Sequence, residues 1–400
     1  MHVRVNIPWL GVNEVAAALR AVAGVGTRPD VALVRAIEQS ERVVVLSTHR
    51  TGRAGLVTVL EALGARGGHA IVPAYVCPAV LAALASVQVT PVFVDVERNS
   101  FRFDAAALQR QVRFARADVI IGANTYGHDQ DFCALAKIGL PVIDDAAYQG
   151  GLPATGSGPT PGTRGTAGIW SFNFKALAGV GGGLVVAGRD AEPRLDIVAG
   201  DRHGPRARRR DVRLLTEYLA RSMLRERIPR FLPGASLPGE NTGMEASHRV
   251  YEAIAGSMSQ FQAATALSLW GRRCTAQTRY MAANALLQTT ITDNGIDRLV
   301  RHIPGGPYPH VYPLLVRDAL ADPATVALLL RQELHARGVQ TEEPYPVAAA
   351  LGEACPNAAS LRSRLILLPV SAGYGDHVHR HVARALLEAA RSVMVAVGLR

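Results

Sequence analysis

The stretch AIVPAYVCPAVLAALASVQVTPVFVDV, residues 70–96, decides the fold class of this chain. Its first and last parts, AIVPA and TPVFVDV, are short apolar runs rich in β-branched residues, which is typical of buried strands. The segment between them, PAVLAALASV, has the length and composition of a helix. A strand, a helix and a second strand in succession form a βαβ unit, so this stretch predicts two parallel strands of one sheet.

Strand patterns and helical patterns continue to alternate on both sides of this unit. Such alternation predicts a mostly parallel sheet covered by helices, which is a three-layer α/β/α sandwich. Ligands of such sheets bind at the carboxyl ends of the strands. Further strands are expected at 43–47, 117–123, 141–146, 167–172 and 183–188, and further helices at 52–65, 103–115 and 132–139.

The pattern changes after residue 190. Long helical patterns without strand signals fill residues 190–285, and a run of turn-forming residues within them predicts a loop at 229–243. A new mixture of strands and helices begins near residue 300. We therefore predict a large domain at 1–285, with a divergent helical and loop segment at 190–257, and a smaller C-terminal α+β domain at 286–400.

The composition narrows the class of protein. Hydrophobic residues make up 48% of the 400 residues and charged residues 19%, which favours a large buried core over disorder. We find no signal peptide at the N-terminus and no apolar run that could span a bilayer. The four cysteines are scattered, without the spacing of a metal site or a disulfide framework. These features predict a cytoplasmic protein with no metal site and no membrane partner.

The formal net charge of +10 raises the question of a nucleic-acid partner. Much of the excess is arginine, and several of these charges lie in the run DRHGPRARRRDVR, residues 201–213. No nucleic-acid-binding motif accompanies this run, so we expect no such partner. The charge is interpreted either as a solvated arginine-rich face or as a surface that attracts an anionic small molecule.

Lys175 lies in SFNFKALAGVGGG, residues 171–183, between a predicted strand and a glycine-rich turn. A lysine at a strand end inside a ligand crevice is partly desolvated, which favours Schiff-base chemistry. The alternative is an ordinary lysine whose ammonium reaches the solvent.

Two aspartates, Asp144 and Asp145, close the predicted strand at 141–146. A carboxylate at this edge can keep a pyridinium nitrogen protonated, so that the ring accepts electrons. The alternative is a helix cap. The spacing does not decide which aspartate has which role, although Asp145 is our candidate for the ring partner.

A third feature is the segment THRTGRAGL, residues 48–56, where a loop becomes a helix. Backbone N–H groups at such a helix start, together with the Thr51 hydroxyl, form a natural phosphate site to which Arg53 can add charge. A plain capped helix is the alternative. A phosphate site, a strand-end aspartate and a strand-end lysine together fit one ligand, pyridoxal 5′-phosphate.

The chain also resembles the DegT/StrS family of sugar aminotransferases, which have the fold type I, aspartate-aminotransferase-like architecture. TGRAGL resembles the family's phosphate loop, VIDDAAYQG resembles E-D-A-A-Q-x-x-G, and SFNFKALAGVGGG resembles S-F-x-x-x-K followed by a glycine turn. Three further segments support the resemblance: AIVPAYVCPAV, ANTYGHDQD and SQFQAATAL.

The resemblance implies a homodimeric, pyridoxal-phosphate-dependent aminotransferase. Glutamate is implied as the amino donor, and the implied acceptor is a keto sugar, usually linked to a nucleotide, in polysaccharide or natural-product biosynthesis. Lys175 is implied as the Schiff-base lysine that also moves a proton, and Asp145 as the partner of the pyridine nitrogen. The other implied cofactor contacts are Thr51, Gly52, Arg53 and Ser171 at the phosphate, Tyr75, Cys77 and Tyr148 around the ring, and Asn173.

The chain departs from the family pattern around the ring. Tyr148 stands where the family has glutamine or histidine, and Cys77 stands at the position of the stacking aromatic residue. Three residues, not four, separate Ser171 from Lys175, and the segment 254–258 lacks the family's asparagine and arginine. These changes leave two alternatives open: a lyase or dehydratase that uses the same cofactor, and a regulatory protein without catalytic activity.

Overall fold

The computed structural model describes residues 1–3, 10–24, 26, 28–154, 158–173, 175–189, 212, 216, 256–306, 308–347 and 351–399. The predicted helical and loop segment at 190–257 and the arginine-rich run at 201–213 therefore lie almost entirely outside the described residues.

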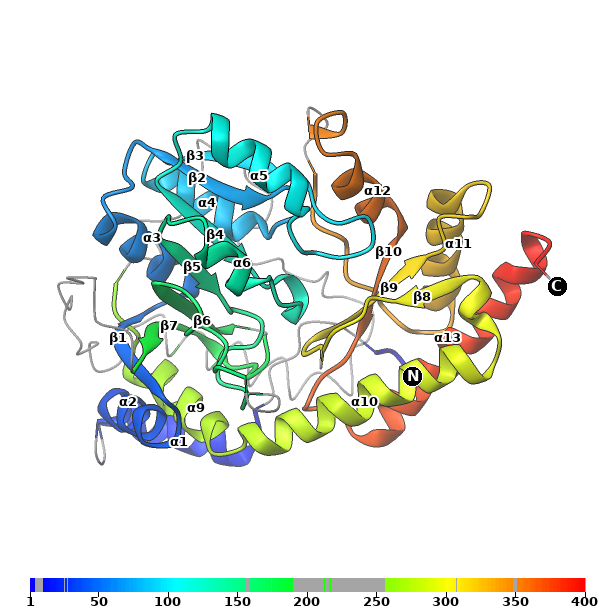
Figure 1. Cartoon of the computed structure of the whole chain (residues 1–400). Helices are drawn as coiled ribbons and strands as arrows, with labels where there is room; N and C mark the ends of the chain where they lie inside the picture. The colour runs from blue at the N-terminus through cyan, green and yellow to red at the C-terminus, as the bar shows by residue number, and fades with distance from the viewer. Residues whose placement is uncertain are drawn as a thin grey trace.

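A seven-stranded sheet forms the centre of the larger part of the molecule (Figure 1). Its strand order is β1-β7-β6-β5-β4-β2-β3, and β7 alone runs antiparallel to its neighbours. The strands are β1 (Val43–His49), β2 (His69–Pro73), β3 (Thr90–Val94), β4 (Val119–Ala123), β5 (Val142–Asp145), β6 (Ala167–Asn173) and β7 (Val180–Gly188). The predicted βαβ unit is present as β2, α4 (Pro78–Ser86) and β3, with the two strands parallel and adjacent.

Both faces of this sheet are buried because alternate residues of each strand point to opposite sides. Val119 and Ile121 pack with α3 (Gly52–Ala62) and α4 on one face, whereas Ile120 packs on the other face with α5 (Ala105–Phe114) and α6 (Phe132–Ala136). Near β6 and β7, that second face is covered by α2 (Pro29–Ser40) and α9 (Gln260–Trp270), and α1 (Val12–Val22) packs against α9. The predicted three-layer α/β/α architecture is confirmed.

A smaller antiparallel sheet, in the order β10-β9-β8, forms the C-terminal part. Leu314 and Ile366 pack on one side of it with the helices, whereas Leu315 and Leu367 pack on the other side with aromatic residues of the large part. The elements are β8 (Val300–His302), β9 (Val311–Val316), α11 (Pro323–Ala336), α12 (Pro356–Arg364), β10 (Leu365–Pro369) and α13 (Asp376–Ala396).

The helical pattern predicted at 259–287 forms two helices because α9 ends at Gly271, and α10 follows at Arg273–Asp293. The predicted domain boundary at 285/286 falls inside α10, which packs against α13 (Figure 1). At the other end of the chain, Val3 pairs with Val339 of the C-terminal part. The division into 1–285 and 286–400 stays a prediction.

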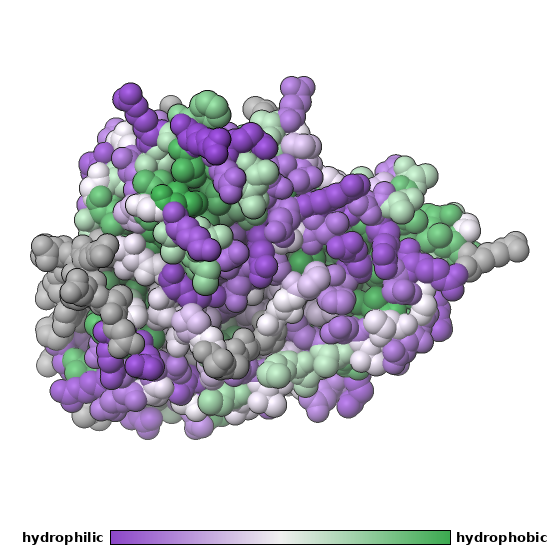
Figure 2. Space-filling view, in the orientation of Figure 1, coloured by the Kyte–Doolittle hydropathy of each residue, from purple (hydrophilic) through white to green (hydrophobic). Residues whose placement is uncertain are grey.

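Hydrophilic side chains predominate on the face shown in Figure 2, and apolar ones form separate patches there. Among the described residues, no helix combines the length and hydropathy needed to cross a membrane. The described part of the chain also contains no group of side chains that could hold a metal ion.

Asp95, just after β3, joins the two parts of the molecule. Its carboxylate accepts the backbone N–H groups of Asn357 at 3.0 Å and Ala358 at 2.9 Å, which belong to the first turn of α12. It also accepts the N–H of Val96 at 2.9 Å. An anion at a helix N-terminus is favoured by the helix dipole, and here it is nearly buried.

We predict that Asp95→Ala lowers the free energy of unfolding by about 1–3 kcal/mol, because buried N–H groups of α12 lose their acceptor. Asp95→Asn keeps one acceptor oxygen and is expected to lose less. Urea denaturation measures both changes. Glu343→Ala is the matched control, since Glu343 has a side chain that is 88% exposed; an equal loss in this control would contradict the prediction.

Candidate active site

The carboxyl ends of β1, β4, β5 and β6 meet at the edge of the large sheet that faces the small sheet. Thr51 follows β1 and caps α3, Asp145 is the last residue of β5, and Lys175 follows the end of β6. β5 and β6 are hydrogen-bonded neighbours, and the charge of Lys175 acts on the Asp145 carboxylate by lowering its pKa against the larger effect of burial. The structure thus brings together the three features that the sequence singled out.

Lys175 is half-buried and lies against an aromatic ring. Its Nζ is 3.6 Å from the centroid of the Tyr148 ring, which is a cation–π contact. The following segment is held in place by Tyr280 of α10, whose hydroxyl donates to the carbonyl oxygen of Ala176 at 2.9 Å. Sequence reasoning missed Tyr280, because nothing local connects a helix residue with a loop so far away in the chain.

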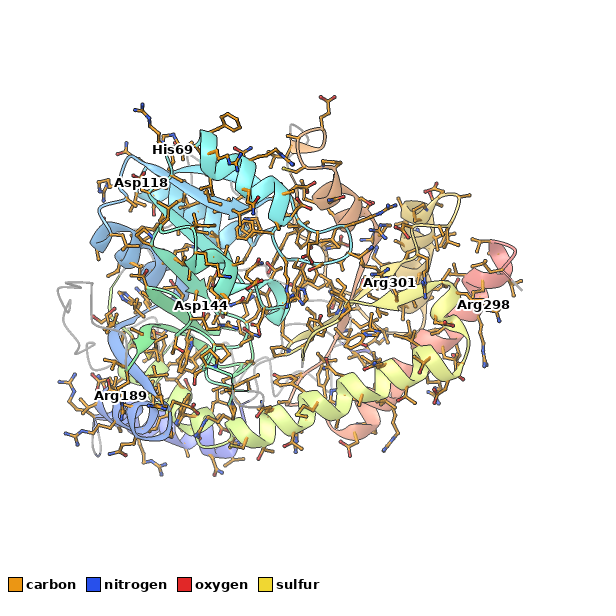
Figure 3. The ribbon with its side chains drawn as sticks, viewed as in Figure 1. His69, Asp118, Asp144, Arg189, Arg298 and Arg301 are labelled. Carbon is orange, nitrogen blue, oxygen red and sulfur yellow. The ribbon has the colours of Figure 1, made fainter. Side chains whose placement is uncertain are left out.

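Asp144 and Asp145 have different surroundings. Asp144 is fully buried and accepts hydrogen bonds from the side chains of Asn124 at 2.7 Å and Arg164 at 2.8 Å. Its carboxylate also accepts the Gly162 N–H at 2.7 Å, so its oxygens are occupied by protein donors. Figure 3 shows Asp144 in the middle of the large sheet. These contacts give Asp144 a structural role, and the pairing of Asp145 with a ring nitrogen stays a prediction.

Asp145 points away from that network and accepts the Ala147 N–H at 3.1 Å. Burial raises the pKa of Asp145 to about 6, while the Ala147 N–H and the charge of Lys175 act in the opposite direction. A carboxylate with so few protein donors can accept a further hydrogen bond or cation, and it lies beside the lysine.

Thr51, Gly52 and Ser171 form a narrow cradle at the start of α3. The Thr51 hydroxyl oxygen accepts the Ala54 N–H at 3.1 Å, which caps the helix. A Cβ added at Gly52 would lie 3.2 Å from the Cβ of Ser171, and one at Gly183 would lie only 2.4 Å from the Gly52 nitrogen. First-turn N–H groups of a helix lack intrahelical acceptors, so this end of α3 suits an anion.

Gln262, near the start of α9, is hydrogen-bonded to Arg50, which precedes Thr51 of the cradle. Its Nε2 donates to the Arg50 carbonyl oxygen at 3.2 Å, and the same oxygen accepts the Gly182 N–H at 3.0 Å. Its Oε1 accepts the Ser259 N–H at 3.2 Å as part of a capping box. The motif SQFQAATAL contained this residue, but its role depends on a contact with a segment more than two hundred residues away.

Four tyrosines form a buried cluster next to Lys175. The hydroxyls of Tyr75 and Tyr126 lie 2.9 Å apart, and the Tyr345 N–H donates to the Tyr75 hydroxyl at 3.0 Å. The rings of Tyr126 and Tyr345 stack with centroids 5.2 Å apart, and the hydroxyl of Tyr345 bonds to that of Tyr148. Tyr126 has a positive φ of 56°, which is uncommon for a bulky residue and is found at functional sites.

The remaining predicted contacts lie around this cluster. Cys77 is half-buried at the start of α4, and the Ser171 hydroxyl oxygen accepts the Asn173 N–H at 3.3 Å. Arg53 is the second residue of α3 and is half-buried. Tyr75 packs against Phe101, Tyr126 and Tyr345.

His310 and Glu342 from the C-terminal part complete the site. The His310 Nε2 lies 3.0 Å from a Glu342 carboxylate oxygen, and both side chains are largely buried. Burial would raise the pKa of Glu342, but the charge and hydrogen bond of His310 and the charge of Lys175 outweigh it and hold the pKa below its ordinary value. Sequence analysis did not identify Glu342, because the sequence TEEPY carries no sign that one glutamate is buried and the next exposed.

Solved structures with the same fold cover nearly the whole chain. Spr1654 from Streptococcus pneumoniae, in its PMP form, has a TM-score of 0.73 and 16% identity, with 99% of each chain covered. Helicobacter pylori PseC, an aminotransferase involved in the biosynthesis of pseudoaminic acid, has a TM-score of 0.67 and 17% identity, with 98% of this chain and 100% of that chain covered. These likenesses confirm the predicted aminotransferase fold.

Curated relatives match a shorter segment. An L-glutamine:scyllo-inosose aminotransferase of Streptomyces griseus is 33% identical over 158 residues, which are 38% of this chain and 37% of the relative. A UDP-N-acetyl-3-dehydro-alpha-D-glucosamine 3-aminotransferase of Acidithiobacillus ferrooxidans is 35% identical over 148 residues, which are 36% of this chain and 39% of the relative. The chain thus matches less than half the length of these relatives.

The sequence model of one family matches residues 42–387, which include every site residue described above. The chain belongs to the DegT/DnrJ/EryC1/StrS aminotransferase family.

Proposed function

We propose that the protein is a pyridoxal 5′-phosphate-dependent aminotransferase that moves an amino group, from glutamate, to a keto sugar or a related polyhydroxylated cyclic ketone. The observation that carries this proposal is the meeting of Lys175, Asp145 and the Thr51–Gly52 cradle at one edge of the sheet. Spr1654, which shares the fold, has been solved in PLP and PMP forms.

The residues present fit this cofactor. The cradle offers a hydroxyl and helix N–H groups, which suit a phosphate. Glycine at 183 lets β7 pack directly against the Thr51–Gly52 backbone, since a Cβ there would lie 2.4 Å from the Gly52 nitrogen. Asp145 offers a carboxylate with a single backbone donor, which suits a protonated pyridine nitrogen. Lys175 supplies a primary amine whose charge acts on that carboxylate.

When bound, pyridoxal phosphate supplies an aldehyde that takes up an amine and a ring that accepts electrons. Lys175 would hold the cofactor and carry the proton between carbon atoms, and Asp145 would keep the ring nitrogen protonated. Thr51, Gly52, Arg53 and Ser171 would bind the phosphate. The proposed contacts around the ring are Tyr75, Cys77 and Tyr148, and Asn173 is a further proposed cofactor contact.

The names of the relatives support the substrate class. The Streptomyces griseus protein is named for an inosose, and the Acidithiobacillus ferrooxidans protein for a nucleotide-linked 3-dehydro sugar. Both acceptors are polyhydroxylated ring ketones. A nucleotide-linked keto sugar is the acceptor that we propose for this chain.

We further propose that the enzyme is a cytoplasmic homodimer. All four cysteines are free, which suits a reducing compartment. The dimer is proposed from the family resemblance. Light scattering on the purified protein tests it, and a monomeric mass would refute it.

The proposed function is tested by mixing the cofactor-loaded protein with L-glutamate. Transamination converts the absorbance of the aldehyde form into that of the amine form and releases 2-oxoglutarate. A keto sugar acceptor should then restore the first spectrum. A protein that keeps its spectrum with every amino donor is not an aminotransferase, and release of ammonia or water from the substrate would indicate a lyase or dehydratase.

We predict that Lys175→Ala lowers turnover about a thousandfold or more, because the group that moves the proton is lost. The chain contains only two lysines, Lys137 and Lys175, so Lys137→Ala is a matched control that should keep full activity. Borohydride reduction of the loaded protein, followed by peptide mass spectrometry, should find the cofactor on Lys175. Finding it on Lys137 would contradict the assignment.

We predict that Asp145 makes the cofactor-free protein less stable as the pH rises from about 4 to about 6. Its folded-state pKa is raised to about 6, so in this window the folded state binds more protons than the unfolded state. The lost stability approaches about 3 kcal/mol. Urea unfolding at several pH values should show this term in the wild type but not in Asp145→Asn. Equal pH profiles for the two proteins would contradict the prediction.

We predict that Gln262→Glu weakens cofactor binding about tenfold, because the Arg50 carbonyl loses one donor and a negative charge is added behind the phosphate cradle. Glutamate preserves the capping box, but its buried charge also lowers the thermal midpoint of the cofactor-free protein, so the affinity is measured at a temperature where both proteins are folded. Fluorescence titration with the cofactor measures the affinity. Gln288→Glu on the exposed side of α10 is the control; weakened affinity in the control as well would point to a general charge effect.

A further inference from the structure

A cleft lies between the loop that follows β3 and the start of the small sheet (Figure 1). Its volume is about 390 Å³, and small-molecule sites generally occupy roughly 300–1,000 Å³. The loop at 97–102 comes from the large part, and β8 with the turn after it supplies the opposite wall. The polar side chains that line the cleft are those of Glu97, Asn99, Ser100, Arg102, His128 and Arg301.

Hydrogen bonds fix the shape of the loop at 97–102. Val96 and Phe103 pair as an antiparallel bridge at its base. Inside the loop, the Glu97 N–H donates to the Arg102 carbonyl oxygen at 2.9 Å. The Arg102 Nε donates to the Asp129 carbonyl oxygen at 2.8 Å, which ties the loop to the segment after β4. A site whose backbone is already ordered loses less entropy when a ligand binds.

Asn99 is oriented by a buried arginine of α12. Arg364 is 1% exposed, and its Nη1 and Nη2 each donate to the Asn99 Oδ1 at 3.3 Å. The other acceptors of Arg364 are backbone carbonyl oxygens and a serine hydroxyl, so no carboxylate of the described residues is bonded to this cation. Because the Asn99 Oδ1 is occupied, the group that Asn99 can offer a ligand is its Nδ2, a donor.

Ser100 is oriented by His128. The Ser100 Oγ lies 2.9 Å from the His128 Nε2 and accepts the Arg102 N–H at 3.1 Å. Burial lowers the pKa of His128 to about 4, so the ring is neutral at pH 7. Its Nδ1 has no partner among the described residues, and buried N–H groups without an acceptor are rarer than buried acceptors without a donor. The ring hydrogen therefore belongs on Nε2, which leaves the Ser100 hydroxyl hydrogen for a ligand.

Arginine side chains supply the charge of the cleft. Arg301, on β8, is half-buried, and its guanidinium has no hydrogen bond or ion pair with another described residue (Figure 3). Burial lowers the pKa of Arg364 behind the cleft, and the charge of Arg301 adds to this effect. Glu97 is exposed at the rim and is the carboxylate among the described lining residues. Donors and positive charges thus predominate, and a buried positive charge is stabilised by an anion.

We propose that this cleft binds the phosphate or diphosphate group of a small molecule. Arg102 and Arg301 are its cations, because a planar guanidinium offers parallel donors to phosphate oxygens. Asn99 and Ser100 add neutral donors between them. The site gives a location to the anionic ligand that the net charge of +10 suggests. The group belongs either to the nucleotide-linked acceptor, a source that rests on the proposed function, or to a separate phosphorylated molecule.

Calorimetric titration with pyrophosphate tests the site. The cofactor-loaded protein is titrated, because its Thr51–Gly52 cradle is then occupied, and the cofactor-free protein is titrated in parallel. Arg301→Gln should weaken pyrophosphate binding about tenfold or more, because a charge-assisted contact is lost. Arg35→Gln removes an exposed charge from α2 and is the matched control, which should stay within about twofold of the wild type.

Asn99→Asp separates anion binding from folding. Aspartate has the size of asparagine and would pair with Arg364, so the thermal midpoint should not fall. It replaces the Nδ2 donor with a negative charge, so pyrophosphate binding should be lost. The proposal is overturned if the wild type does not bind pyrophosphate, if Asn99→Asp binds it equally well, or if Arg35→Gln weakens binding as much as Arg301→Gln does.

Inhibition kinetics distinguish the two sources of the phosphate group. If the group belongs to the acceptor, pyrophosphate competes with the nucleotide-linked keto sugar, and Arg301→Gln raises the KM for that sugar about tenfold. If it belongs to a separate molecule, pyrophosphate changes kcat without competing with the sugar, and Arg301→Gln raises the concentration required about tenfold. The titrations need no turnover, so a failure of the proposed aminotransferase activity remains distinguishable from a failure of the site.

Discussion

The buried ion pair between Asp144 and Arg164 fixes the strand edge on which the site depends. Arg164 donates to both carboxylate oxygens of Asp144, at 2.8 Å and 3.1 Å. Asn124 adds a further donor from the end of β4, so three segments are tied together at one fully buried charge. Removing one partner from such a pair generally costs about 3–5 kcal/mol, because the other charge stays buried. Successive strand residues point to opposite faces, so the anchoring of Asp144 also sets the direction of Asp145.

The sequence was sufficient for the features that follow from strand ends. In a parallel sheet the carboxyl ends share one edge, so Thr51, Asp145 and Lys175 could be placed at that edge from the sequence alone. The adjacent aspartates could not be assigned, because both residue types fit both roles. Their assignment depends on Arg164, which a loop brings back beside β5.

The contacts that sequence analysis missed come from segments far along the chain. Gln262 reaches the Arg50 carbonyl from α9, and Tyr280 reaches the lysine loop from α10. Tyr345 and Glu342 arrive from the C-terminal part, whose sheet packs its inner face on the tyrosine cluster. Hydrophobic periodicity identifies a strand or helix, but it does not say which distant side chain meets which loop. The sequence does not show the boundary between the two parts either. The predicted boundary at 285/286 lies inside α10, which continues through it without a break.

The packing shows what the residues that depart from the family pattern contact. Tyr148 replaces a smaller polar side chain, and its ring supports the Lys175 ammonium while its hydroxyl bonds to Tyr345. The Tyr148 side chain thus contacts both Lys175 of the large part and Tyr345 of the C-terminal part. The half-buried Cys77 leaves more room than an aromatic residue would at the same position. Tyr148 and Cys77 thus exchange sizes relative to the pattern that the resemblance gives, a large ring standing for a smaller polar side chain and a thiol for an aromatic ring, while Thr51, Asp145 and Lys175 follow the ends of β1, β5 and β6.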